Sequence, residues 1–117
     1  SGSQIVGLHV VPNFPQFAYE VPGVPLQLSD YEKACARHAE KALNPLDRRS
    51  KAAGVECKVR YVFSDNPAAE IVRVARRDRC DLIVMASHGR RGLSAVLLGS
   101  ETQKVLTHSP IPVLVVR

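Results

Sequence analysis

The sequence has no tryptophan, only three tyrosines and three phenylalanines, and three cysteines without a C-x-x-C pair. Few aromatics argue against a nucleic-acid surface, because single-stranded nucleic acids bind by stacking bases on aromatic rings. The odd number and the spacing of the cysteines argue against a disulfide framework and a zinc ribbon. We therefore expect reduced, buried thiols, no structural metal and no nucleic-acid partner.

Long apolar runs are also missing. The longest, such as "LIVMA" and "PVLVV", fall far short of the roughly 20 residues that cross a bilayer. The stretch "SGSQIVGLHVV" lacks the basic region and long apolar core of a signal peptide. These features predict a cytoplasmic protein without a membrane partner.

What is present fits a single globular domain over residues 1–117, with 45% apolar and 23% charged residues. The net charge is +5, but the basic residues are scattered among eleven acids rather than gathered in one stripe. This distribution favours a small phosphate-bearing ligand, or no specific anion, over a nucleic-acid groove.

Hydrophobic periodicity and the positions of proline and glycine predict alternating strands and helices. Near-continuous apolar runs indicate buried parallel strands, and one segment with period-two alternation indicates a strand nearer a sheet edge. Strands are expected at 5–11, 55–63, 81–86 and 112–117, and helices at 29–54, 67–80 and 100–109. This order predicts an α/β fold, a doubly wound open parallel sheet that binds ligands beyond the carboxyl ends of its strands.

The ends of the helices also have sequence signals. Ser29 and Glu32 form a capping-box pattern, and Asn66 with the proline after it is typical of a helix start. Pro45 interrupts the first helical stretch, which is then either one kinked helix or two helices with Asn44 capping the second. A glycine at position 54 is expected to end it.

The stretch "MASHGRRGLSAVLLGSETQKVL" places glycines where a buried strand leads into a helix. It contains neither a P-loop nor a G-x-G-x-x-G fingerprint. Gly99 and Ser100 fall at the helix start, where free N–H groups and the helix dipole favour an anion. The alternative is that Gly89 and Gly92 only make turns and Ser100 only caps the helix. The spacing leaves both interpretations open.

Residues 81–117, together with the strand "GLHVVP" near the N-terminus, closely resemble universal stress protein domains. Members of that family that bind ATP carry the pattern G-2x-G-9x-G-[ST]. Here Gly89, nine intervening residues, Gly99 and Ser100 match it, whereas Ala86 replaces the first glycine. The methyl group of Ala86 narrows the space where the backbone would approach a nucleotide.

The resemblance implies an adenine nucleotide, ATP or AMP, that Mg²⁺ can accompany, and a stress-response or regulatory role. It also implies a homodimer formed through the last strand, Val113 to Arg117. It implies contacts to the phosphates and ribose at Gly89, Gly99, Ser100, Glu101 and Thr102, and to adenine near Val10 and Met85. Ala86 and His88 are two further positions of the binding motif.

Family domains begin with another strand and helix, so the resemblance implies about thirty further residues before residue 1. Without that strand, which is central in the family, the strands on either side would lack a neighbour. No catalytic triad or paired carboxylates are recognisable, and at most weak ATP hydrolysis or self-phosphorylation is expected. The alternatives are a dimeric interaction module that binds no nucleotide and an ATP-using enzyme of the wider superfamily.

Overall fold

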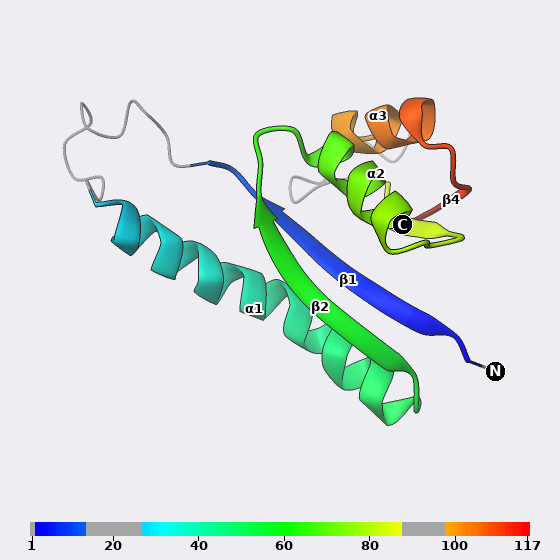
Figure 1. The fold of residues 1–117 in the computed structure, drawn as a ribbon, viewed down its shortest axis with the longest axis horizontal. Helices are drawn as coiled ribbons and strands as arrows, with labels where there is room; N and C mark the ends of the chain where they lie inside the picture. The colour runs from blue at the N-terminus through cyan, green and yellow to red at the C-terminus, as the bar shows by residue number, and fades with distance from the viewer. Residues whose placement is uncertain (1, 14–26, 88–97) are drawn as a thin grey trace. The chain divides into compact units, whose positions relative to one another are not determined.

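The structure, a computed structural model, describes residues 2–13, 27–87 and 98–117. The chain divides into two compact units, Ser1–Asp65 and Asn66–Arg117, and each is described by itself. The predicted order of strands and helices is confirmed (Figure 1). The elements are β1 Gln4–Val11, α1 Leu28–Ala52, β2 Glu56–Phe63, α2 Pro67–Arg77, β3 Ile83–Ala86, α3 Ser100–His108 and β4 Val113–Val116.

The first unit is a β-α-β arrangement in which β1 pairs in parallel with β2 over eight residues. Helix α1 lies against one face of this pair (Figure 1). Gly7 on β1 allows the close approach, because a Cβ atom there would lie 2.6 Å from Cδ2 of Leu46 and 3.1 Å from Cγ1 of Val59. The glycine is therefore required by packing and not by a turn.

Helix α1 is continuous through Pro45, which decides between the two predicted arrangements in favour of a single helix. Proline removes one helical hydrogen bond, but Pro45 is exposed, so water can satisfy the carbonyl left without a donor. Leu43 and Leu46, on either side of the proline, both reach Gly7. Packing against the sheet thus holds the two halves of the helix in line.

The predicted capping box at the start of α1 is wrong. The helix begins at Leu28, the N-cap is Gln27, and no side chain caps it. Ser29 therefore lies inside the first turn rather than before it. The predicted end is confirmed, since Gly54 has φ of +72° and follows the last turn.

In the second unit, β3 pairs in parallel with β4 from Ile83 opposite Val113 to Ala86 opposite Val116. Helices α2 and α3 pack together and share one apolar core with the strands. Its buried members are Ala68, Ala75, Ile83 and Val105, with Ile71, Val72, Cys80, Met85, Ile111 and Val113 packed against them.

The predicted start of α2 is confirmed. Oδ1 of Asn66 accepts a hydrogen bond of 3.2 Å from the backbone N–H of Ala69, and Pro67 is the first helical residue. The three arginines of the helix lie on its exposed side, as expected.

Each sheet has two strands in the described residues, so β1 and β3 have one strand neighbour each. The three cysteines are free, with Cys35 buried and Cys57 and Cys80 half-buried. Among the helices in the described ranges, none is both long and apolar enough to cross a bilayer.

Candidate functional site

The first turn of α3 lies at the carboxyl end of β3, and two hydrogen bonds join them. The N–H of Gly99 donates to the carbonyl oxygen of Ser87 at 2.7 Å. Oγ1 of Thr102 donates to the carbonyl oxygen of Ala86 at 2.9 Å. The end of the strand and the start of the helix therefore form one fixed arrangement. The predicted site residues His88 and Gly89 lie outside the described residues.

Within the part of the chain that the structure describes, the N-terminus of α3 leaves backbone donors open. The hydrogen-bonded ladder of the helix starts where the N–H of Gln103 donates to the carbonyl oxygen of Gly99, at 3.0 Å. The N–H groups of the three residues before Gln103 have no acceptor within the helix. The N-cap is Gly99, which has no side chain to accept from them. These donors and the helix dipole together favour an anion.

The N-terminus of α2 is different, because the protein satisfies it internally. Asn66 accepts from the N–H of Ala69, and Oε2 of Glu101 accepts from the N–H of Ala68 at 3.0 Å. A carboxylate of α3 thus already occupies the positive end of α2. Of the two helix starts in this unit, only that of α3 remains open to an external anion among the described residues.

Glu101 has a structural role here. Its Oε2 atom holds the start of α2, and its Oε1 atom lies 3.3 Å from Nζ of Lys104. Both carboxylate oxygens therefore have protein partners. Family resemblance had implied a nucleotide contact at Glu101. The sequence could not reveal the structural role, because the bond from Ala68 spans 33 positions and leaves no local pattern.

Thr102 is also committed to the protein. It is 3% exposed, and its hydroxyl donates to the carbonyl oxygen of Ala86. Ser100, by contrast, is exposed and is the first helical residue. The expectation that Ser100 caps the helix is wrong, because the N-cap is Gly99, whose φ of −61° and ψ of 152° are extended. Ser100 is thereby left exposed in the first turn of α3.

The structure brings six of the predicted site residues together in the second unit: Met85, Ala86, Gly99, Ser100, Glu101 and Thr102. Met85 is half-buried and packs against the core cluster. Ala86 follows it on the opposite face of β3 and is exposed. Val10 lies in the first unit, where it pairs with Val62.

Reactive side chains are few around this arrangement. Burial, with the nearby carboxylates of Asp78 and Asp81, raises the pKa of the Cys80 thiol, which disfavours the nucleophilic thiolate. Within the described residues, no group of three or more His, Cys, Asp or Glu side chains could hold a metal ion. The chemistry that the described site offers is anion binding by backbone N–H groups and a hydroxyl.

Comparison with known proteins places this geometry in a family. The sequence matches the Universal stress protein family over residues 1–117. A universal stress protein from Thermus aquaticus, named for its place in the QAH/OAS sulfhydrylase 3′ region, is 29% identical over 116 residues, covering 99% of this chain and 79% of that protein.

Two solved structures extend the comparison to the fold. MJ0577 of Methanocaldococcus jannaschii superposes with a TM-score of 0.80 at 28% identity, covering 99% of this chain and 76% of that one. A universal stress protein in complex with cAMP gives a TM-score of 0.54 at 25% identity, covering 94% of this chain and 71% of that one. These similarities confirm the predicted α/β fold with parallel strands. The chain belongs to the universal stress protein family.

Proposed function

We propose that this universal stress protein domain binds an adenine nucleotide, ATP or AMP, at the start of α3. In this proposal the exposed hydroxyl of Ser100 and the first N–H groups of α3 bind phosphate oxygens. Thr102 and Glu101 position the helix end instead of touching the ligand. The protein acts in the cytoplasm as a stress-response or regulatory protein that senses the nucleotide.

The observation that carries the proposal is the contrast between the two helix starts of the second unit. Asn66 and Glu101 occupy the donors of α2. At α3 the N-cap is a glycine, and no side chain caps the helix. The start of α1 also lacks a side-chain cap. The start of α3 differs because two hydrogen bonds tie it to the carboxyl end of β3, which suits a ligand.

The cAMP complex of a structural neighbour supports an adenine ligand. ATP, AMP and cAMP share adenine, ribose and an anionic phosphate, so each offers the charge that the α3 start would bind. The described residues supply no cluster of metal ligands. Any Mg²⁺ would therefore be held chiefly by the phosphates, as is usual for Mg²⁺.

Isothermal titration calorimetry with ATP, AMP and GTP tests the proposal. We expect heat of binding for both adenine nucleotides and weaker binding of GTP. The variant Ser100→Ala should weaken ATP binding at least about tenfold, since a hydrogen bond to a charged group contributes about 1.5 kcal/mol or more. Absence of heat with all three nucleotides would refute nucleotide binding.

Two further variants serve as controls. Ser29→Ala removes another exposed serine in the first turn of a helix, α1, and should leave ATP affinity unchanged. Gly99→Val places a branched side chain at the N-cap, where the backbone angles are open to any residue. It should abolish binding, with circular dichroism checking that the helices remain; unchanged affinity would mean that the α3 start is only structural.

A second candidate function is a dimeric interaction module that binds no nucleotide. Three observations favour it. Ala86 stands where ATP-binding members have glycine, β4 has one strand neighbour among the described residues, and the face of β3 and β4 opposite the helices exposes large apolar side chains. Those side chains are Leu82, Val84, Leu114 and Val116, which are between 42% and 59% exposed.

Sedimentation equilibrium distinguishes this candidate. If the last strand forms a homodimer, Leu114→Lys should shift the protein toward monomer, since a charge on an apolar interface is costly to desolvate. Lys58→Ala, on an exposed position of β2, is the matched control and should leave the mass unchanged. A monomeric parent protein would refute the dimer.

A further inference from the structure

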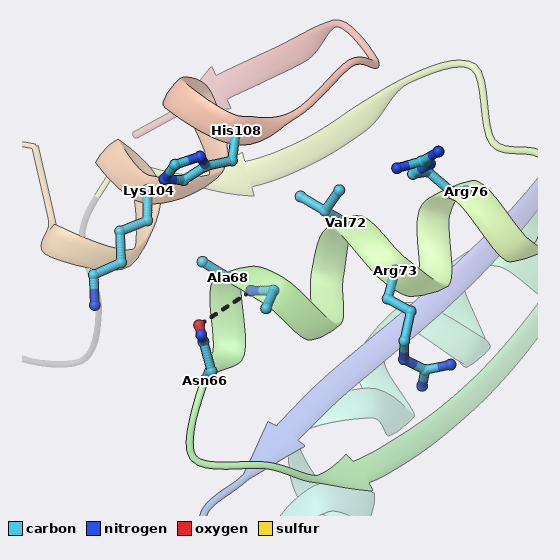
Figure 2. Close-up of a pocket in the computed structure, with 8 residues that line it drawn as sticks. Asn66, Ala68, Val72, Arg73, Arg76, Lys104 and His108 are labelled. Carbon is cyan, nitrogen blue, oxygen red and sulfur yellow. Dashed lines mark hydrogen bonds between the residues drawn. The ribbon is translucent and has the colours of Figure 1, made fainter.

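Lys104 lies one helical turn after Ser100 on α3, and its ammonium group is held at the start of that helix. Residues four apart share one face of a helix, and a long side chain covers the turn before its own Cα atom. Nζ of Lys104 accordingly lies 3.3 Å from Oε1 of Glu101, in the first turn. Figure 2 shows the lysine side chain extending away from His108, the last residue of α3. A cation therefore stands beside the helix start at which we place the phosphate.

Glu101 puts a negative charge at the same helix start. Its Oε2 atom accepts from the N–H of Ala68, which holds the carboxylate in place. Glu101 also follows Ser100 directly in the chain, so this charge lies near an anion bound at the start of α3. Like charges that lie close together repel each other. The carboxylate therefore weakens an anion site here unless a positive charge offsets it.

An ordinary role for the lysine is an ion pair within the helix. Exposed pairs between residues three apart are common and contribute little to stability. Arg73 and Glu70 form such a pair on α2, with 2.8 Å between Nη2 and Oε2. The side chain of Arg73 is 51% exposed and that of Lys104 is 56% exposed, so the two cations are well matched. Figure 2 shows Arg73 extending from α2 away from α3, so only Lys104 is placed beside the proposed site.

The ion pair leaves Lys104 able to bind an anion as well. An ammonium group has three N–H donors. Among the residues that the structure describes, Oε1 of Glu101 is its one acceptor. The lysine side chain is more than half exposed, so a ligand can reach the remaining donors. One ammonium group can therefore hold the carboxylate and a phosphate oxygen at the same time.

We propose that Lys104 binds a phosphate oxygen of the nucleotide and makes the site favour ligands with more phosphate charge. This inference rests on the proposed function, because it adds a residue to the same site. In the free protein the ammonium group pairs with Glu101. When a nucleotide binds at the start of α3, the same group bridges the carboxylate and the phosphate. Repulsion by Glu101 is thereby offset, and ATP gains more than AMP because it carries more negative charge.

Isothermal titration calorimetry of Lys104→Gln with ATP and AMP tests this role. ATP affinity should fall about tenfold, because a charge-assisted hydrogen bond to phosphate is lost. AMP affinity should fall less. Arg73→Gln removes the matched cation of α2 and should bind ATP like the parent protein. Lys104→Arg keeps the positive charge and should bind ATP more tightly than Lys104→Gln.

ATP titrations at several salt concentrations separate an ionic contact from a structural effect. The affinity of the parent protein should fall more steeply with salt than that of Lys104→Gln, because salt screens a charge contact that the variant lacks. Circular dichroism of each variant checks that the helices remain.

Three results would overturn the proposal: equal ATP affinity of Lys104→Gln and Arg73→Gln, equal salt dependence of the parent protein and Lys104→Gln, and equal weakening by Lys104→Gln and Lys104→Arg. ATP binding by the parent protein with any of these results would refute the role of Lys104 alone. Absence of ATP binding by the parent protein would refute the proposed function itself, and the role of Lys104 with it.

Discussion

The replacement of Thr102 by valine tests whether the start of α3 is fixed to β3 by a side chain. Valine keeps the branched shape and removes only the hydroxyl that donates to the carbonyl oxygen of Ala86 at 2.9 Å. Ile83 and Ser87 direct their backbone N–H groups to β4, so the backbone groups of Ala86 point to the other edge of β3. The threonine hydroxyl is the donor that reaches that carbonyl in the described structure.

The expected loss follows from burial. Thr102 is 3% exposed, so water does not readily replace its hydroxyl. The bond is part-buried, because Thr102 is buried and Ala86 is exposed, so its loss costs about 0.5–1.5 kcal/mol; we expect Thr102→Val to lower the free energy of unfolding by that amount. Because the first N–H groups of α3 would then be less firmly held, ATP affinity should fall as well.

Urea unfolding followed by circular dichroism measures the effect, and Thr107→Val supplies the control. Oγ1 of Thr107 donates to the carbonyl oxygen of Gln103 at 2.8 Å, nearly the same length, but Thr107 is exposed. Its replacement should change stability by less than about 0.5 kcal/mol. Equal effects of the two substitutions would refute the reasoning that the Thr102 bond is a buried anchor.

Three further outcomes are expected. Glu101→Gln should lower the free energy of unfolding in urea by about 0.5–1 kcal/mol, because the negative charge at the start of α2 is lost. This decrease should be smaller in high salt, and a salt-independent decrease would contradict the dipole explanation. Gly7→Ala should lower the free energy of unfolding by about 1–2 kcal/mol, since the new Cβ would lie 2.6 Å from Cδ2 of Leu46 and the leucine side chain must shift. A stabilised variant would show that α1 packs less closely on β1 than the structure indicates. Burial raises the pKa of Tyr31 from 10 to about 12, so the folded state favours the neutral phenol. The contribution of Tyr31 to stability is fully present below pH 10 and is lost as pH rises toward 12. In urea unfolding across this range, Tyr31→Phe should make the fall in stability shallower, and an identical pH profile would contradict this explanation.

Periodicity and breakers predicted the elements of this protein well, because each signal is local. Asn66 followed by proline marked the start of α2, and Gly54 marked the end of α1. The capping box failed because the same residue types also suit the first turn of a helix. Pro45 left two arrangements open, since only packing on β1 decides that the helix continues.

The candidate site could be predicted only in part. The glycine-serine step located the open start of α3, but the anchoring roles of Glu101 and Thr102 depend on tertiary neighbours.

The central claim is that the open N–H groups of α3 bind the phosphates of an adenine nucleotide. An NMR titration of the ¹⁵N-labelled protein with ATP tests it most directly, because it reports each backbone amide. The amides of Ser100, Glu101 and Thr102 should shift strongly and saturably, while those of Ala68 and Ala69, whose donors are already occupied, should shift little. Unchanged α3 amides at saturating ATP, or equal shifts at the two helix starts, would contradict the claim.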